Sequence, residues 1–299
     1  MTLKKHSYTG RTDNPSIKER FHQVVKEYSN ETNSDVIIGF MSDEGVKRNK
    51  GRVGASLGPV KIREKMASLP YIREIFDVGS VVGTTELEVS QAELGNQISN
   101  LLKKDNFVLI LGGGHETLYG HYLGVRETFK DEKICVLNID AHFDLRNETS
   151  SSGTMFHQIL SSDKNIHYKV LGIQPLGNTK TLFETANQFG VEYYTIDKIR
   201  ENKDLLFTLS TTLQNYDKVF MTLCMDSVKA SDAPGVSAPS SNGFTSLEIK
   251  TIIEHFAKLN NLVSFDISEV SPEHDRDDMT SALAAFLSVT FLNSKNENV

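Results

Sequence analysis

The sequence lacks the long apolar runs and the basic stripes that mark membrane-spanning and nucleic-acid-binding proteins. None of its apolar runs approaches the roughly 18 residues needed to span a bilayer. Residues 1–15 show neither the apolar segment nor the cleavage pattern of a secretory signal. The formal net charge is −7, and Lys and Arg are not clustered as they are in proteins that bind polyanions. We therefore expect a cytoplasmic protein with neither a membrane nor a nucleic acid as its partner.

Cysteine is also scarce, because Cys135 and Cys224 are the only two. Both lie inside apolar segments typical of strands, which favours buried, reduced thiols over a disulfide framework. Hydrophobic residues make up 38% of the chain and charged residues 24%, as in a soluble globular protein. The sequence contains no internal repeat, linker or low-complexity segment.

Apolar segments with the length of strands alternate with segments typical of helices along most of the chain. Many of them are nearly uninterrupted by polar residues, as strands are when both faces of a parallel sheet are buried. The expected strands are 35–40, 75–78, 106–111, 134–139, 167–172, 191–195, 217–226 and 262–267. We predict an α/β fold with a single domain over residues 35–299. Residues 1–34 are predicted to form an N-terminal extension packed on that domain, with a polar helix over about 16–28.

The densest chemistry follows the strand 134–139, which runs directly into Asp140, His142 and Asp144. Because side chains alternate along an extended chain, these three should point in one direction. Carboxylate oxygens and imidazole nitrogens together suit a hard or borderline divalent metal. The alternative interpretation is an ordinary polar turn after a core strand.

A glycine-rich turn with the sequence GGGHE follows the strand 106–111 at residues 112–116. Its spacing matches neither the P-loop nor the dinucleotide-binding fingerprint, which disfavours phosphate binding. His115 alone would be as consistent with a structural role, but Asp226 and Glu269 also follow apolar strands. In a parallel sheet these strand ends meet at the carboxyl edge, where open α/β sheets bind ligands. Two imidazoles and several carboxylates at that edge predict a two-metal hydrolytic site.

Four motifs resemble those of the ureohydrolase superfamily, which includes the arginases and agmatinases. They are GGGHE at 112–116, DAHFD at 140–144, the segment 222–239 and SEVSP at 268–272. Within this superfamily the chain is most similar to the formimidoylglutamases of histidine degradation, on segments 9–13, 43–55, 152–154 and 233–239. Agmatinases usually carry histidine at the position of Ser152, and arginases carry it at the position of Phe156. Both departures point away from those relatives.

The resemblance implies a three-layer α/β/α fold around an eight-stranded, mostly parallel sheet. It also implies hydrolysis of N-formimidoyl-L-glutamate to L-glutamate and formamide, two Mn²⁺ ions per chain and a homo-oligomer. Two such metal ions would lower the pKa of the water bound to them and so provide the hydroxide for the hydrolysis. By family position, one metal would be held by His115, Asp140, Asp144 and residue 224, and the other by Asp140, His142, residue 224 and Asp226.

The resemblance implies further roles for residues close to the metals. Glu269 would pair with the cationic nitrogen face of the formimidoyl group, and Asp144 would align the attacking hydroxide. His157 would shuttle a proton or serve a supporting role. The guanidinium group of an arginine matches the geometry of a carboxylate, so arginines are candidates for binding the substrate carboxylates. The full set of candidates for binding the substrate is Arg146, Asn49, Arg48, Arg52, Ser152 and Glu269.

One position departs from the superfamily pattern. Where most members have Asp-x-Asp, this chain has Cys224-Met225-Asp226, so a thiol replaces a carboxylate expected to bridge the metals. Thiolate coordination, a one-metal enzyme and loss of activity are the three interpretations. Cysteine is a softer ligand than manganese prefers, although zinc or iron would accept it. If the chain is not a formimidoylglutamase, the alternatives are an agmatinase, a guanidino-acid hydrolase or a non-catalytic ureohydrolase-like binding protein.

Overall fold

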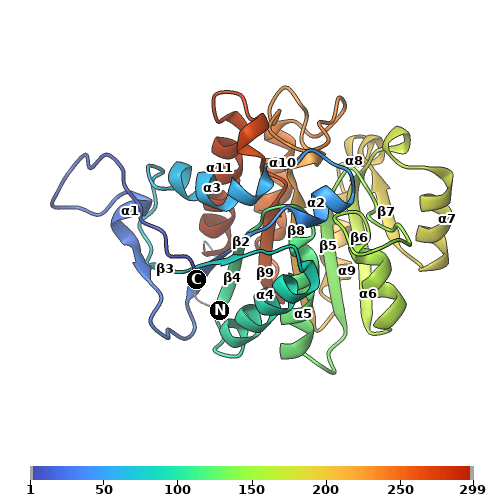
Figure 1. The fold of residues 1–299 in the computed structure, drawn as a ribbon, viewed down its shortest axis with the longest axis horizontal. Coiled ribbons are helices and arrows are strands. Elements are labelled where there is room, and N and C mark those ends of the chain that lie inside the picture. Colours follow the sequence, from blue (N-terminus) through green and yellow to red (C-terminus); the bar gives the residue numbers. More distant parts are fainter. Residues whose placement is uncertain (1–2, 297–299) are drawn as a thin grey trace.

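In the computed structural model, which describes residues 3–296, nine strands form one sheet whose strand pairs are all parallel (Figure 1). The order across the sheet is β1-β3-β2-β4-β9-β8-β5-β6-β7. Parallel pairing places all the carboxyl ends at one edge of the sheet. The strands are β1 (Val25–Glu27), β2 (Asp35–Met41), β3 (Ile75–Val82), β4 (Phe107–Leu111), β5 (Ile134–Ile139), β6 (Ile166–Ile173), β7 (Glu192–Thr195), β8 (Lys218–Cys224) and β9 (Leu262–Ser268).

Eleven α-helices are present in residues 3–296, and in Figure 1 α1 and α7 lie at opposite ends of the molecule. Within the same residues, no helix is both long and apolar enough to cross a membrane. The helices are α1 (Phe21–Val24), α2 (Glu44–Arg48), α3 (Gly58–Met66), α4 (Leu87–Leu102), α5 (Thr117–Thr128), α6 (Met155–Ser162), α7 (Lys180–Gln188), α8 (Ile196–Glu201), α9 (Leu205–Leu213), α10 (Ser246–Phe256) and α11 (Met279–Asn296).

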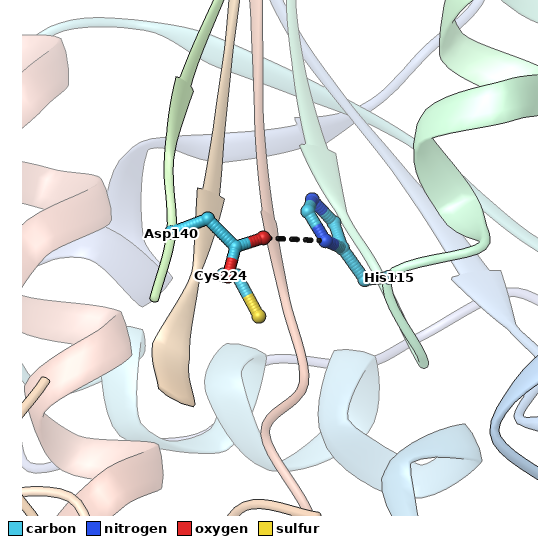
Figure 2. Close-up of side chains that lie close together, drawn as sticks. All are labelled: His115, Asp140 and Cys224. Carbon is cyan, nitrogen blue, oxygen red and sulfur yellow. Dashed lines mark ion pairs between the residues drawn. The ribbon is translucent and has the colours of Figure 1, made fainter. Parts of the chain in front are cut away.

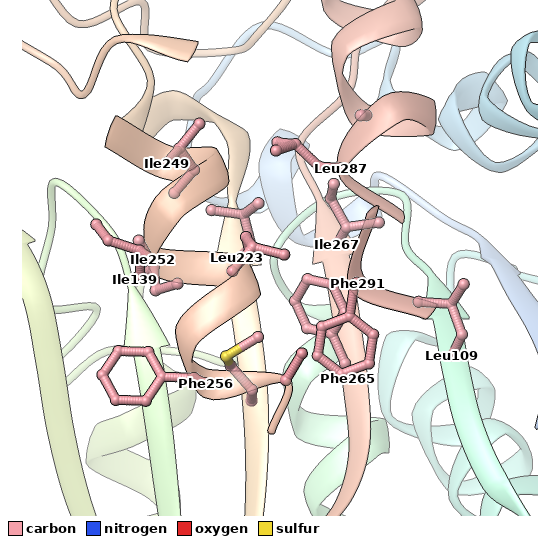
Figure 3. Close-up of a cluster of buried hydrophobic side chains, with 14 of the residues drawn as sticks. Leu109, Ile139, Leu223, Ile249, Ile252, Phe256, Phe265, Ile267, Leu287 and Phe291 are labelled. Carbon is pink, nitrogen blue, oxygen red and sulfur yellow. The ribbon is translucent and has the colours of Figure 1, made fainter. Parts of the chain in front are cut away.

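Successive side chains of the central strands point to opposite faces of the sheet, and they pack into two separate apolar cores. In β4, Leu109 and Leu111 belong to a core shared with α3, α10 and α11, part of which is drawn in Figure 3. Val108 and Ile110 belong to a second core shared with α4, α5 and α6. A sheet that is apolar on both faces needs a helical layer on each. The predicted three-layer α/β/α fold is confirmed.

The predicted sheet has eight strands, whereas the observed sheet has nine. The additional strand, β1, lies in the segment that was expected to be a helix. The helix predicted over 16–28 is wrong, since only α1 is helical there and the chain then extends into β1. Val25 of β1 pairs with Ile75 of β3. Two consecutive β-branched residues, Val24 and Val25, favour an extended chain, and the edge of β3 offers backbone groups for it to pair with. The boundary at residue 35 between extension and domain stays a prediction.

Candidate metal centre

The predicted ligands come together at the carboxyl ends of four strands that lie side by side in the sheet, in the order β4, β9, β8 and β5. His115 lies in the turn after β4, Asp140 follows β5, Cys224 ends β8 and Glu269 follows β9. Figure 2 shows the side chains of His115, Asp140 and Cys224 pointing toward one another from these strand ends. The parallel sheet thus gathers residues that lie more than a hundred positions apart in the sequence.

Two groups of possible ligand atoms share the carboxylate of Asp140. The first consists of the buried residues His115, Asp140 and Cys224, and the second of Asp140, His142 and Asp226, with ligand atoms within 4.8 Å of one another in each. Asp144 adds to the first group, because its Oδ2 lies 2.9 Å from His115 Nδ1. A carboxylate common to both groups would lie between two ions. This donor set therefore suits two neighbouring divalent cations.

A chain of hydrogen bonds determines which nitrogen of His115 faces the carboxylates. The hydroxyl of Thr222 donates to Asp266 Oδ1 at 2.8 Å, so it accepts the hydrogen bond from His115 Nε2 at 3.0 Å. The other nitrogen, Nδ1, lies 3.1 Å from Asp140 Oδ2 and 2.9 Å from Asp144 Oδ2. Although burial lowers it, the two carboxylates hold the pKa of His115 well above its usual value. A positive charge, either a proton or a metal ion, is favoured at Nδ1.

Negative charge accumulates around the same atoms. Burial, reinforced by the charge of Asp140, raises the pKa of Asp144 to about 6. Burial, reinforced by Asp226 and Glu116, raises the pKa of Glu269 to about 8. Within residues 3–296, the buried oxygens Asp226 Oδ1 and Glu269 Oε2 find no hydrogen-bond partner. Crowded carboxylates with unpaired buried oxygens are stabilised by cations, so the charge distribution also fits divalent metals.

The thiol of Cys224 lies in the same negative environment. Burial, reinforced by the charges of Asp140, Asp226 and Glu269, raises the pKa of Cys224 well above its usual value. The thiol is therefore protonated at neutral pH when no cation lies beside it. A coordinating divalent metal reverses this effect and deprotonates the thiol.

Asp144 and Glu269 both adopt a left-handed backbone conformation, with φ angles of 51° and 70°. For residues other than glycine this conformation costs about 1–3 kcal/mol and persists only where neighbouring contacts enforce it. Glu269 is fixed from two sides, since its N–H donates to the carbonyl of Gly113 at 2.7 Å and its Oε1 accepts the N–H of His115 at 2.8 Å. The turn after β9 is thereby attached to the turn after β4.

A cavity of about 150 Å³ opens onto these ligands. Asn49, Arg146 and Ser152 also line it. Arg146 Nη1 donates to Asn49 Oδ1 at 3.3 Å, and Asn49 Nδ2 donates to Ser152 Oγ at 3.3 Å. Three of the predicted substrate-binding residues therefore form one hydrogen-bonded set in the same cavity as the predicted metal ligands. The remaining lining residues are His115, His142, Asp144, Gly153, Gly177, Asn178, Leu182, Cys224, Asp226, Ser237, Ala238 and Glu269.

Three other predicted residues are not among those that line the cavity. The guanidinium of Arg48 lies 2.7 Å from Glu88, on the outer side of α2. Arg52 Nε donates to the carbonyl of Ser237 at 3.0 Å and so holds a loop. His157 lies on α6 with its Nδ1 3.5 Å from Ser161 Oγ. Arg48 and His157 thus have partners outside the cavity lining, whereas Arg52 contacts the backbone of the lining residue Ser237.

The structure also brings in polar residues that the sequence interpretation did not single out, among them Thr222, Asn178 and Ser237. Asn178 donates to the carbonyl of Ala141 at 2.9 Å and accepts the N–H of Phe143 at 3.1 Å, which shapes the loop after β5. Thr222 could have been identified from the sequence, because it lies two residues before position 224 and therefore on the same face of the strand. Asn178 and Ser237 reach the site from loops whose course depends on the whole fold.

Comparison with known proteins agrees with the geometry. The arginase family matches residues 33–293. The formimidoylglutamase of Lysinibacillus sphaericus (strain C3-41) is 43% identical over 96% of this chain and 95% of that protein. The formimidoylglutamase of Geobacillus sp. (strain WCH70) is 42% identical over 94% of this chain and 92% of that protein.

Two solved structures share the fold. The formimidoylglutamase from Bacillus subtilis superposes with a TM-score of 0.87 at 24% identity, over 95% of this chain and 94% of that chain. The Trypanosoma cruzi formiminoglutamase with Mn²⁺ superposes with a TM-score of 0.85 at 23% identity, over 93% and 98%. Because the family match spans most of the sequence and relatives exceed 40% identity over nearly the full length, this chain belongs to the arginase family.

Proposed function

We propose that this chain is a formimidoylglutamase, a metal-dependent hydrolase that converts N-formimidoyl-L-glutamate and water to L-glutamate and formamide. The observation that carries the proposal is the pair of ligand groups sharing Asp140, members of which line one small cavity together with Arg146. The substrate matches such a cavity, because it joins an amidine group to two carboxylates, one on the carbon next to the amidine nitrogen and one at the end of the side chain. The two similar relatives named above are formimidoylglutamases.

The proposed cofactor is a pair of Mn²⁺ ions, the ion named for the Trypanosoma cruzi structure. Divalent ions held at this position would lower the pKa of a bound water and so supply hydroxide at neutral pH. The donor set is mostly carboxylate and imidazole, which suits manganese, and the thiol is the exception. The residues proposed to hold the ions are His115, Asp140, His142, Asp144, Cys224 and Asp226.

Two cavity-lining carboxylates are assigned to the reaction itself. Glu269 has a buried oxygen free of hydrogen bonds, which can accept from the cationic nitrogens of the formimidoyl group and orient its carbon for attack. The bond from that carbon to the glutamate nitrogen then breaks, and this nitrogen takes up a proton. Asp144, which lines the cavity beside the proposed metal position, can accept the proton of the attacking water. A role for His157 in proton transfer stays a prediction.

Arg146 is proposed to bind a substrate carboxylate, assisted by Asn49 and Ser152. Replacing Arg146 with alanine should raise KM for formimidoylglutamate by about ten- to a hundredfold, the loss expected when a charged hydrogen bond is removed. Substrate and transition state share this contact, so kcat should change little. Steady-state kinetics of the manganese-loaded variant measures both constants.

Arg276→Ala is the matched control for Arg146→Ala, because Arg276 is exposed and its Nε lies 3.8 Å from the neighbouring Asp277. Its KM should stay within about threefold of the wild-type value. If Arg146→Ala behaves like this control, the assignment of Arg146 to the substrate carboxylates is incorrect.

Cys224 is proposed to coordinate metal as a thiolate. Cys224→Ser should lower manganese occupancy because it removes a charged ligand, whereas Cys224→Asp should raise occupancy because it supplies the carboxylate that manganese prefers. Occupancy is measured by elemental analysis after dialysis of all three proteins against one fixed manganese concentration. Equal occupancy in the three proteins would assign Cys224 to packing alone.

The proposal is tested by incubating the manganese-loaded protein with formimidoylglutamate and quantifying formamide and glutamate. Equimolar release of both products at a rate proportional to protein concentration supports it. No release from a fully loaded protein would leave the chain as a ureohydrolase-like binding protein. A homo-oligomer remains the expectation from the family resemblance, and a cytoplasmic location remains the expectation from the sequence. Sedimentation of the purified protein tests its assembly.

A further inference from the structure

The carboxyl of Glu116, directly after the proposed ligand His115, has no part in the mechanism above. Its side chain is fully buried and is not among the residues that line the cavity. Its Oε1 accepts the N–H of Gly45 at 2.9 Å and the hydroxyl of Ser42 at 3.3 Å, both in the segment that follows β2. Glu116 therefore connects the turn that carries His115 to the loop that leads into α2.

The two segments approach so closely that only glycine fits at the contact. A Cβ on Gly45 would lie 2.6 Å from Glu116 Cβ and Cδ. A Cβ on Gly114 would collide with Glu116 Oε2, and one on Gly113 would collide with the carbonyl of Ser42. The N–H of Gly114 also donates to the carbonyl of Ser42 at 2.8 Å. The contact is thus closely packed and hydrogen-bonded from both sides, so a shift of Glu116 would move the loop.

From Gly45 the connection continues to the cavity wall. The carbonyl of Gly45 accepts the N–H of Asn49 at 2.9 Å and the N–H of Ser152 at 3.1 Å. The side chain of Asn49 in turn contacts Ser152 and Arg146, each at 3.3 Å. The residues proposed to bind the substrate carboxylates therefore depend on the backbone of Gly45, whose N–H end is fixed by Glu116.

We infer that Glu116 is a positioning residue that sets the distance between the metal ligands and the carboxylate-binding residues Asn49, Ser152 and Arg146. This inference rests on the proposed function. Glu116 acts through Gly45 and does not touch the substrate. Its loss should therefore weaken binding of the carboxylate end of the substrate while leaving the metals in place.

The test compares Glu116→Ala and Glu116→Gln in the full, manganese-loaded chain. Alanine removes the acceptor for Gly45, and KM for formimidoylglutamate should rise about tenfold or more, since small displacements of positioning groups have large kinetic effects. Glutamine retains an acceptor oxygen, so it should keep KM within about threefold of wild type. Manganese content should be unchanged in both variants.

A second substrate separates positioning from general damage. N-butylformamidine has the same reacting carbon and no carboxylate, so its kcat/KM should be nearly the same in Glu116→Ala and wild type. Glu88→Ala is the matched control, because it removes an exposed glutamate that contacts α2 through Arg48. Its KM for formimidoylglutamate should stay within about threefold of wild type.

If Glu116→Ala fails to fold by thermal melting, Gly45→Ala takes its place, since the added Cβ would displace the loop from an intact Glu116. It should raise KM for formimidoylglutamate selectively, and unchanged KM would contradict the inference. Loss of manganese, equal loss on both substrates, or a glutamine variant as defective as alanine would also overturn it. Wild-type protein that neither turns over formimidoylglutamate nor binds glutamate by calorimetry would overturn the proposed function and this inference together. Active wild type with an unaffected Glu116→Ala variant would overturn this inference alone.

Discussion

Removal of divalent metal is expected to lower turnover of formimidoylglutamate by about a thousandfold or more, and added Mn²⁺ should restore it. The expectation follows from the crowding of Asp140, Asp144, Asp226 and Glu269 around two histidines, which leaves an excess of negative charge for cations to balance. Without the ions, water at this position keeps its ordinary high pKa and supplies almost no hydroxide at neutral pH. Activity is measured after chelation, after dialysis and during titration with MnCl₂.

Metal content must be followed in the same samples. Elemental analysis should show manganese leaving with chelation and returning with activity, and the midpoint of thermal unfolding reports whether the metal-free chain stays folded. Full activity in excess chelator, with no metal detected, would contradict a metal-dependent mechanism.

Glu269→Gln is expected to lower kcat/KM by about a hundred- to a thousandfold while manganese stays bound. Glutamine preserves the shape and can still accept the hydrogen bond from the N–H of His115, which Glu269 accepts at 2.8 Å. The metal cations beside Glu269 would keep its carboxyl ionised, and the substitution removes this charge, which would stabilise the cationic formimidoyl group. One such electrostatic contact has an effect of about this size. The measurement is kcat/KM together with metal content.

Glu254→Gln serves as the control, because Glu254 is a carboxylate on the outer side of α10 that pairs with Lys250. It should leave kcat/KM within about threefold of wild type. A Glu269→Gln variant with normal kinetics would exclude a charge-dependent role for Glu269. A variant that loses manganese would instead assign Glu269 to the metal centre.

The central strands could be predicted because burial on both faces leaves a clear pattern in the sequence. β4 and β5 are short and almost wholly apolar. A glycine-rich turn follows β4 and Asp140 follows β5, so both their type and their carboxyl ends were evident. β1 could not be predicted, since its three residues are partly buried or exposed and its pairing depends on the edge of β3. Its conformation is decided by tertiary contact and not by its own pattern.

The predicted ligands share one property, which is that each lies at or shortly after the end of a central strand. His115, Asp140 and Asp226 could therefore be grouped before the fold was known, because parallel strands end at one edge. The cationic side chains could not be assigned in this way. Besides Glu44 one helical turn before it, Arg48 pairs with Glu88, forty residues away, and the carbonyl that accepts from Arg52 belongs to Ser237. No local pattern shows such contacts.

The most direct test of the central claim compares four substrates on the same manganese-loaded protein. They are formimidoylglutamate, agmatine, arginine and guanidinobutyrate, and kcat/KM is measured for each under identical conditions. The cavity that joins Arg146 to the metal ligands predicts that formimidoylglutamate, the only one with two carboxylates, has the highest kcat/KM. A higher kcat/KM for any of the other three would contradict the account.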